Sequence, residues 1–283
     1  MKIYLNNIRL VVCDIDGTLT HDKTIIPSAY TIEILEKLHE KGILFGLASG
    51  RGVEQLRDLK TDWGLSFDFD LVIGLNGSEY YDLKSEQKTQ LFSLSEMDIK
   101  EIITGMLKEF PDLNCSIYRN NVRILRFIDE KAIDSKKKTN MDNYLLKDLS
   151  ELWSEPCSKV MFRVTEEIME KIEPLAKHLS NDRYRSTKTQ STMLEFVHAK
   201  ANKGTALEEY CRNNDLDLSQ VISFGDMNND IELLQVAGIG VCMINGNKET
   251  KASADIISDL TNNEDGCAAF IERYILNHEP YET

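Results

Sequence analysis

The chain has 283 residues, of which 42% are hydrophobic and 28% are charged, and its formal net charge at pH 7 is −14. This composition is that of an ordinary globular protein, and the length predicts one large domain or two modest ones. The acidic balance argues against a nucleic-acid partner, which normally needs a basic face, and against docking on an anionic membrane.

The six cysteines are scattered along the chain, with no CxxC pair and no spacing typical of a metal site. In a chain of this length, such cysteines fit reduced thiols in a cytoplasmic protein. Residues 1–7 lack the apolar segment of a signal peptide, and no apolar run approaches the roughly 18 residues that span a membrane. We therefore expect a soluble, cytoplasmic protein, whose oligomeric state the sequence does not indicate.

Strands and helices alternate in the first part of the chain. Residues 8–13 form a continuous apolar run, which is typical of a strand buried on both faces of a parallel sheet. Pro27 opens a helix that Gly42 ends, and further strands are predicted at 43–48 and 71–73. This succession indicates a parallel sheet with helices on both faces.

The rhythm changes in the middle of the chain. Two strand-like runs between 114 and 127 flank Asn120 and Asn121, which favour a hairpin turn. An alternating strand at 159–164 and a helix at 166–179 follow. These elements predict an antiparallel α+β insert.

After a strand at 191–197, the alternation of helices and strands resumes from residue 202. The expected elements are a helix at 205–211, strands at 221–224, 239–242 and 255–257, and a helix at 268–276. The predicted fold is therefore α/β. A Rossmann-like parallel-sheet core is formed by residues 1–84 and 190–283, and an α+β cap domain is inserted at 85–189.

Two of the predicted strands end in turns that are rich in carboxylates. Asp14 and Asp16 follow the first strand, and Asp226 and Asp230 follow the strand that resumes the sheet. The carboxyl ends of parallel strands lie at one edge of a sheet, so these four side chains can converge there. Clustered carboxylates repel one another unless a hard divalent cation neutralises them, and oxygen ligands suit Mg²⁺.

The first of these turns can carry phosphoryl chemistry. Asp14 can attack phosphorus and form an aspartyl-phosphate. Asp16, two residues on, can give a proton to the leaving oxygen and later take one from the attacking water. The alternative is a turn in which both aspartates only cap backbone groups.

Five further residues are candidates for phosphate or substrate binding. Ser49 and Gly50 end a predicted strand, so a hydroxyl and backbone N–H groups can hold a phosphate there, although Ser49 could simply cap a helix. Arg51 faces either substrate or solvent. Lys203 can place a positive charge on the phosphate, since a lysine at a helix start is otherwise disfavoured by the dipole. Asn76 either binds substrate or forms an Asn-Gly turn.

These motifs resemble those of the haloacid dehalogenase-like phosphatases, and within them the Cof-type sugar-phosphatase-like branch. The resemblance spans nearly the whole chain and rests on four segments in the order that the family requires: residues 14–18, 49–51, 203–204 and 225–230. The insert lies where that branch keeps its cap domain. Residues 263–268 are similar to the closing motif of the branch.

The resemblance implies an enzyme that hydrolyses small phosphomonoesters with Mg²⁺ through an aspartyl-phosphate. It implies that Asp14 and Asp226 bind Mg²⁺ through their side chains and Asp16 through its backbone carbonyl. Asn229 and Asp230 would hold the water shell of the metal or orient its ligands. The serine and the lysine described above would hold the phosphate.

The strand predicted in the cap has two different faces. Alternation places Val160, Phe162 and Val164 on one side of it and Lys159 and Arg163 on the other. The apolar side should pack on the helices of the cap. The two cations are then free to bind substrate, unless they are ordinary solvated residues.

The sequence does not name the substrate, because cap side chains select it. Sugar phosphates are the range that the resemblance implies, and phosphorylated cofactors such as flavin mononucleotide or pyridoxal phosphate are also open. One rival function is a phosphotransferase or phosphomutase on the same scaffold. Another is a non-catalytic phosphometabolite-binding protein, which the intact pair of Asp14 and Asp16 disfavours.

Overall fold

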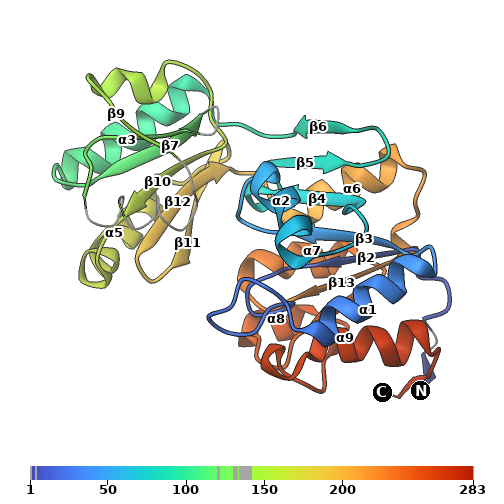
Figure 1. The fold of residues 1–283 in the computed structure, drawn as a ribbon. Helices are drawn as coiled ribbons and strands as arrows, with labels where there is room; N and C mark the ends of the chain where they lie inside the picture. The colour runs from blue at the N-terminus through green and yellow to red at the C-terminus, as the bar shows by residue number, and fades with distance from the viewer. Residues whose placement is uncertain (1, 4, 120–121, 130–132, 134–141, 283) are drawn as a thin grey trace. The chain divides into compact units, whose positions relative to one another are not determined.

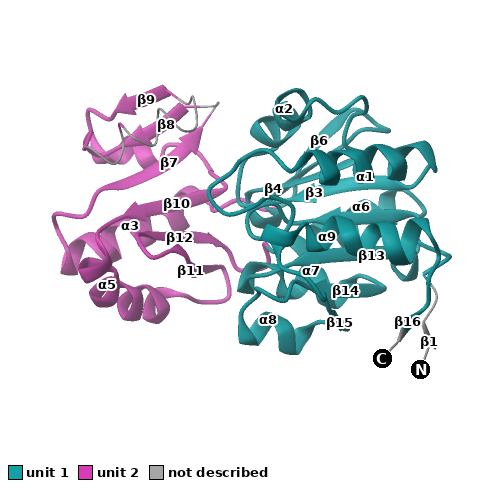
Figure 2. Cartoon of the chain, turned by 60° about the horizontal axis from the view of Figure 1, so that its bottom comes forward, with its two compact units in different colours: residues 1–91, 202–283 teal, residues 92–201 magenta. Residues whose placement is uncertain are grey.

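We analyse the fold in a computed structural model of the chain, which describes residues 2–3, 5–119, 122–129, 133 and 142–282. The chain divides into two compact units, which Figure 2 colours separately. Unit 1 consists of Met1–Leu91 and Asn202–Thr283, and unit 2 of Phe92–Ala201. Each unit has its own main sheet and its own buried apolar core.

Unit 1 is built on an eight-stranded sheet with the order β15-β14-β13-β2-β3-β4-β5-β6 (Figure 1). The six strands from β15 to β4 pair in parallel, and β5 and β6 continue the sheet in antiparallel pairing. The strands are β2 (Leu10–Cys13), β3 (Leu44–Ala48), β4 (Leu71–Gly74), β5 (Glu79–Asp82), β6 (Gln87–Gln90), β13 (Val221–Gly225), β14 (Ile239–Cys242) and β15 (Ile256–Ile257). Near the chain ends, β1 (Lys2–Ile3) pairs with β16 (Tyr281–Glu282).

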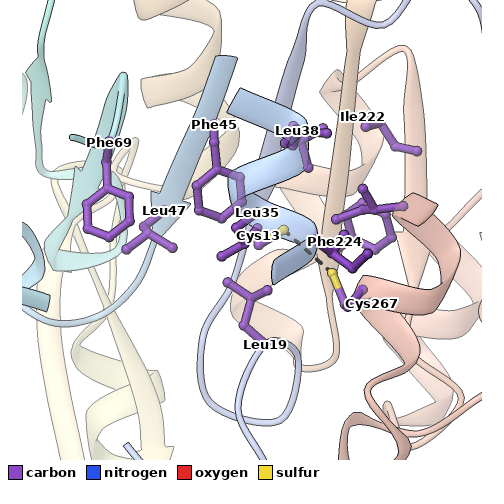
Figure 3. Close-up of a cluster of buried hydrophobic side chains, with 14 of the residues drawn as sticks. Cys13, Leu19, Leu35, Leu38, Phe45, Leu47, Phe69, Ile222, Phe224 and Cys267 are labelled. Atoms are coloured by element: carbon purple, nitrogen blue, oxygen red, sulfur yellow. Dashed lines mark hydrogen bonds between the residues drawn. The ribbon is translucent and has the colours of Figure 1, made fainter. Parts of the chain in front are cut away.

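Helices cover both faces of this sheet. They are α1 (Ala29–Glu40), α2 (Val53–Trp63), α6 (Lys203–Asn213), α7 (Ile231–Val236), α8 (Lys248–Ser253) and α9 (Gly266–Phe270), the last continued by a π-helical stretch, Ile271–Leu276. On one face α1, α2 and α9 pack with Val11 and Phe45, in the cluster that Figure 3 shows in part. On the other face α6 and α7 pack with Leu10 and Val12. Covered faces explain why β2 is apolar at successive positions, and the predicted α/β fold is confirmed.

Unit 2 has a six-stranded sheet with the order β11-β12-β10-β7-β8-β9. Its strands are β7 (Cys115–Arg119), β8 (Val122–Leu125), β9 (Asp142–Leu145), β10 (Lys159–Arg163), β11 (Tyr184–Gln190) and β12 (Met193–His198), and its helices are α3 (Glu96–Glu109) and α5 (Glu166–Leu179). All neighbours pair antiparallel except β8 and β9, which are parallel. The two helices cover one face of the sheet, where Val160, Phe162 and Val164 join their apolar side chains, as the alternation predicts.

Short 3-10 turns complete both units: η1 (Leu75–Gly77), η2 (Leu149–Trp153), η3 (Leu218–Gln220), η4 (Asn228–Asp230) and η5 (Asn262–Glu264). β7 and β8 form the expected antiparallel pair, with Arg119 opposite Val122. The turn predicted at Asn120 and Asn121 lies outside the described residues.

The boundaries between the units differ from the predicted 84/85 and 189/190. β6 pairs with β5 and therefore extends the sheet of unit 1 to residue 90. β12 pairs with β10 and β11 and therefore belongs to the sheet of unit 2. Strand pairing decides these boundaries, and the apolar pattern of a single strand does not reveal which sheet it joins.

All six cysteines are free thiols and are buried. In the cluster of Figure 3, the sulfur atoms of Cys13 and Cys267 approach to 3.7 Å. Among the helices of the described ranges, none is long and apolar enough to cross a membrane.

Candidate active site

Asp14 lies at the carboxyl end of β2, between two parallel neighbours. Its backbone N–H donates to the carbonyl of Phe224 at 3.0 Å, which ties it to the adjacent end of β13. Its side chain is buried. The parallel order of β13, β2 and β3 thus puts the ends of three strands at one edge of the sheet, where ligands of open α/β sheets bind.

The second acidic turn meets the first at this edge. Asp230 folds back on the end of β13, and one of its oxygens accepts hydrogen bonds from the backbone N–H groups of Asp226 and Met227 at 3.0 and 3.1 Å. A side chain at Gly225 would collide with Asp230, so only glycine permits this return. One carboxylate oxygen from each of Asp14, Asp226 and Asp230 lies within 4.8 Å of the others.

Lys203 is the cation of this cluster. It is the first residue of α6 and is fully buried. Its Nζ lies 2.5 Å from an oxygen of Asp14 and 2.6 Å from an oxygen of Asp230. Burial lowers the pKa of Lys203, but the two carboxylates outweigh it and raise that pKa above its ordinary value. The lysine therefore stays charged, although it lies at the positive end of a helix.

The three carboxylates exceed the single lysine in charge. Burial and the neighbouring Asp230 raise the pKa of Asp226 to about 7, although the Thr18 hydroxyl and Lys203 oppose this. Burial likewise raises the pKa of Asp14, with Lys203 acting against it. The raised pKa values of Asp14 and Asp226 reflect the cost of burying several negative charges together, and a hard cation would offset this cost, since carboxylate oxygens are the donors that Mg²⁺ prefers.

Asp16 has a different environment from Asp14. Its side chain is exposed, and both of its oxygens accept hydrogen bonds from Nη2 of Arg51 at 2.8 and 2.9 Å. Gly17, the next residue, has φ +86°, and a Cβ there would lie 2.5 Å from an oxygen of Asp226. Glycine is needed at this position for both its backbone conformation and its lack of a side chain. Arg51 thus contacts Asp16, another candidate site residue, and does not face solvent alone.

Ser49 and Asn76 form the neighbouring part of the same edge. Ser49 follows β3, is buried, and its hydroxyl accepts a hydrogen bond from the N–H of Arg51 at 3.3 Å. The backbone N–H of Asn76 donates to the Ser49 carbonyl at 3.0 Å. A Cβ at Gly50 would touch the amide of Asn76, so the glycine leaves room for that side chain. Asn76 also accepts a hydrogen bond from Asn229 at 3.2 Å.

The two candidates in the cap strand lie in unit 2. Lys159 is buried, and its Nζ forms an ion pair with Glu195 of β12 at 2.8 Å. It is therefore not the uncompensated charge that the alternation suggested, because a carboxylate of the next strand, far away in sequence, neutralises it. Arg163 is half-buried and contacts the sulfur of Met193 at 3.7 Å.

Sequence reasoning did not assign a role to two residues that brace the turn carrying Asp14 and Asp16. The hydroxyl of Thr18 donates to Asp226 at 3.2 Å, and the amide of Asn245 donates to the Gly17 carbonyl at 2.8 Å. Asn245 lies just beyond β14, and a polar residue after a parallel strand is a signal that could have identified it.

Residues near the end of the chain also contact the segment that follows this turn. The side-chain amide of Asn262 donates to the carbonyl of Thr20 at 2.9 Å, and a ring nitrogen of His21 lies 2.8 Å from an oxygen of Asp265. These contacts hold Thr20 and His21, which follow the turn that carries Asp14 and Asp16. The similarity of residues 263–268 to a closing motif is thereby given a physical meaning.

The chain is similar to proteins of one known family. A family model described as haloacid dehalogenase-like hydrolase matches residues 11–271. A relative from Haemophilus influenzae, named "Putative phosphatase", is 32% identical over 93% of this chain and 97% of its own length. A 5-amino-6-(5-phospho-D-ribitylamino)uracil phosphatase from Bacillus subtilis is 25% identical over 94% of this chain and 97% of its own.

A longer relative is the chloroplastic endoribonuclease YBEY of Arabidopsis thaliana, 26% identical over 97% of this chain. The chain spans 48% of that protein. Among solved structures, a haloacid dehalogenase-like hydrolase from Bacteroides thetaiotaomicron has a TM-score of 0.78 at 25% identity and covers 94% of this chain and 99% of its own. A Thermotoga maritima structure has a TM-score of 0.81 at 25% identity and covers 97% and 98%.

Proposed function

The chain belongs to the haloacid dehalogenase-like hydrolases and is a phosphatase, and from this premise we propose that it hydrolyses small phosphomonoesters with Mg²⁺ through an aspartyl-phosphate on Asp14. The observation that carries this proposal is the buried cluster in which Lys203 contacts Asp14 at 2.5 Å beside Asp226 and Asp230. Such an assembly offers a nucleophile, a fixed positive charge and oxygen donors for a metal at one strand edge.

In the first step, an oxygen of Asp14 attacks phosphorus and the bond from phosphorus to the leaving oxygen breaks. Asp16 gives its proton to that oxygen. In the second step, a water molecule attacks the aspartyl-phosphate and Asp16 takes up its proton. Phosphate leaves and the Asp14 carboxylate is restored. The contact of Arg51 with both oxygens of Asp16 supports a role in holding this group in place.

Charge on the transferred group needs compensation throughout. We assign Lys203, the Ser49 hydroxyl and the N–H groups around Gly50 to the phosphate oxygens, with Asn76 beside them. Asp14 and Asp226 would bind Mg²⁺ through their side chains and Asp16 through its carbonyl, while Asn229 and Asp230 orient the ligands or the water shell. Bound there, Mg²⁺ supplies charge neutralisation to the phosphoryl group.

The substrate is, in this proposal, a sugar phosphate or a related phosphorylated metabolite. The name of the Bacillus subtilis relative, which specifies a phosphoribityl compound, supports a small phosphate ester of a polyol chain. The buried free thiols support a cytoplasmic location.

The direct test is the Asp14→Asn variant assayed with p-nitrophenyl phosphate and Mg²⁺. We expect an intact fold and essentially no phosphate release, because an amide is a poor nucleophile and a poor metal ligand. Phosphate release at the wild-type rate by the folded variant would refute the assignment. Measuring free phosphate beside any phosphorylated acceptor distinguishes hydrolysis from phosphoryl transfer.

The metal requirement is tested separately. Excess chelator should abolish wild-type activity, and Mg²⁺ should restore it. Ca²⁺ should inhibit, since it prefers more ligands at longer distances than an in-line attack tolerates. Full activity in excess chelator would contradict the proposed role of the metal.

A further inference from the structure

Asp16 lies in a tight turn that follows β2. Within this turn, the carbonyl of Ile15 accepts hydrogen bonds from the backbone N–H groups of Leu19 and Thr20, each at 3.0 Å. Asp16 itself pairs with Thr20 in an isolated β-bridge. The turn therefore closes around Asp16, whose side chain is exposed. The position of this side chain depends on the conformation of the turn.

Asn245 holds the residue that follows Asp16. It lies just beyond β14, and its side-chain amide donates to the carbonyl of Gly17 at 2.8 Å. Its side-chain oxygen accepts a hydrogen bond from the backbone N–H of Asn262 at 3.0 Å. One amide side chain thus connects two segments of backbone, because it donates and accepts at the same time.

Asn262 holds the bridge partner of Asp16. Its side-chain nitrogen donates to the carbonyl of Thr20 at 2.9 Å and to a carboxylate oxygen of Asp22 at 3.1 Å. Asn262 is only 2% exposed, so its bond to Thr20 is shielded from water. A buried hydrogen bond of this kind resists breaking, because breaking it leaves a polar group unpaired.

We call Asn245 and Asn262 the amide clamp. The two residues lie in different segments, the loop after β14 and η5, and act on two carbonyls of the same turn. Amides suit this place because they are neutral, whereas aspartates would add negative charge to a site that already contains Asp14, Asp226 and Asp230. The clamp thus holds the turn without increasing the repulsion among the carboxylates.

The clamp and Arg51 act on different parts of Asp16. Nη2 of Arg51 contacts both carboxylate oxygens at 2.8 and 2.9 Å, whereas the clamp holds the backbone that carries this carboxylate. General acid catalysis requires the proton to be within hydrogen-bond reach of the leaving oxygen. A misplacement of about 1 Å can lower a rate by about 10²-fold. Contacts that keep the backbone of Asp16 in place therefore bear directly on the rate of proton transfer.

We propose that Asn245 and Asn262 are positioning residues for proton transfer, which hold the turn so that Asp16 can give its proton to the leaving oxygen. In this proposal they contact neither the phosphoryl group nor the metal and act only through Asp16. The inference rests on the proposed phosphatase function and deepens it. The clamp should therefore matter most for substrates whose leaving group needs a proton.

The test compares p-nitrophenyl phosphate with phenyl phosphate at saturating Mg²⁺. The two esters are similar in shape, but nitrophenolate leaves readily without a proton, whereas phenolate is a poorer leaving group. Because kcat/KM covers the steps up to the aspartyl-phosphate, the ratio of kcat/KM for p-nitrophenyl phosphate to that for phenyl phosphate reports the need for the acid. A smaller fraction of folded enzyme lowers both values equally and leaves this ratio unchanged.

Asn245→Ala is the main variant, because Asn245 is exposed and its replacement should not prevent folding. It should raise the ratio at least about threefold, since phenyl phosphate depends more strongly on a well-placed acid. Asn262→Ala should raise the ratio in the same way, and it should also lower Tm because Asn262 is buried.

Asn213→Ala is the matched control. It removes an amide of unit 1 that donates to the hydroxyl of Tyr80 at 3.0 Å, at the opposite end of α6 from Lys203. Its ratio should equal that of the wild-type protein. A threefold rise in this variant would overturn the inference, because the effect would then not be specific to the clamp.

Asp16→Asn separates this inference from the proposed function, and it should raise the ratio more than either clamp variant does. If the wild-type protein hydrolyses neither ester, the proposed function fails. If Asp16→Asn leaves the ratio unchanged, the acid role of Asp16 fails and the inference fails with it. If Asp16→Asn raises the ratio and Asn245→Ala raises it less than about threefold, the proposed function stands and the positioning role is overturned.

Discussion

At the residue scale, the site depends on charges that compensate one another after burial. Lys203 is 0% exposed and Asp14 is 7% exposed, yet they lie 2.5 Å apart. Removing water from either group alone would be costly, whereas the pair retains a favourable contact. The remaining carboxylates, Asp226 and Asp230, exceed what one lysine neutralises. This surplus of negative charge is the physical reason for proposing that a cation binds at the same place.

Asp16 gives the first prediction at this scale. Asp16→Asn should lower kcat for an alkyl phosphate by about 10² to 10⁴-fold, since the amide cannot transfer the proton. Mg²⁺ binding should be largely kept, because the proposed contact of this residue with the metal is its backbone carbonyl. The measurement is steady-state kinetics together with Mg²⁺ titration by calorimetry.

A matched control for this prediction is Asp62→Asn, which removes an exposed carboxylate on α2. It should behave as wild type. A loss below tenfold in Asp16→Asn would place the proton transfer on another group.

The pKa of Asp226 gives the second prediction. Burial and Asp230 raise it to about 7, from 3.8 for an unperturbed aspartate. The proton therefore stabilises the metal-free fold fully below the unfolded value, and this contribution is lost as the pH rises through about 7. Because Mg²⁺ competes with that proton, the affinity for Mg²⁺ should increase between about pH 6 and pH 8.

The measurement is the increase of Tm that Mg²⁺ causes at each pH. In the wild-type protein, the Mg²⁺-induced increase of Tm should be larger at the higher pH. In Asp226→Asn, this increase should depend much less on pH. Equal Mg²⁺ effects across the range would show that no proton is displaced.

At the element scale, the site needs a close approach of two backbones. Gly77 ends η1 with φ +90°, and a side chain there would collide with the carbonyl of Asn202, the N-cap of α6. The side-chain oxygen of Asn202 caps the helix start by accepting a hydrogen bond from the N–H of Thr205. The loop that carries Asn76 and the helix that carries Lys203 are thus positioned together.

We predict that Gly77→Ala destabilises the protein beyond the cost of its backbone conformation. Gly42→Ala is the matched control, since Gly42 also has a positive φ, +72°, but no atom lies within 4 Å of its added Cβ. In both variants, an alanine at positive φ should lower the free energy of unfolding by about 1–2 kcal/mol. In Gly77→Ala, overpacking should lower it by about 1–3 kcal/mol more. Urea unfolding measures the difference. Equal losses would show that η1 yields without strain.

At the scale of the whole molecule, the two units have separate apolar cores. Trp63 lies in the core of unit 1, and Trp153 packs against the core of unit 2. The chain has only these two tryptophans. Each unit therefore has its own fluorescent probe once the other tryptophan is replaced by phenylalanine.

We predict that the units respond separately to damage in their cores. Phe162→Ala removes a fully buried ring of unit 2 and should cost about 3–5 kcal/mol there. In urea, the midpoint reported by Trp153 should fall while that of Trp63 changes little. Phe45→Ala in unit 1 should give the reverse pattern. Coincident shifts of both probes would indicate one cooperative unit instead.

Features that depend on residues close together in the sequence could be predicted, whereas features that depend on pairing between distant strands could not. The apolar run that becomes β2 and the glycines of the acidic turns are local, so their patterns predicted the α/β core and the convergence of four aspartates at its edge. Asp14, Asp226 and Asp230 do meet there, whereas the side chain of Asp16 is exposed and contacts Arg51. Parallel pairing guarantees that strand ends meet, which is why sequence reasoning could place residues two hundred positions apart in one site.

Pairing between distant strands was decided only by the tertiary structure. β12 joins the sheet of unit 2, which moved the boundary of that unit, and it brings Glu195 to Lys159, which removed the free charge expected there. The same register places Arg123 beside Tyr118, whose hydroxyl accepts a hydrogen bond from the guanidinium. The sequence shows which side chains carry a charge. Whether that charge is neutralised depends on its neighbours, and these are set by which strands pair and in which register.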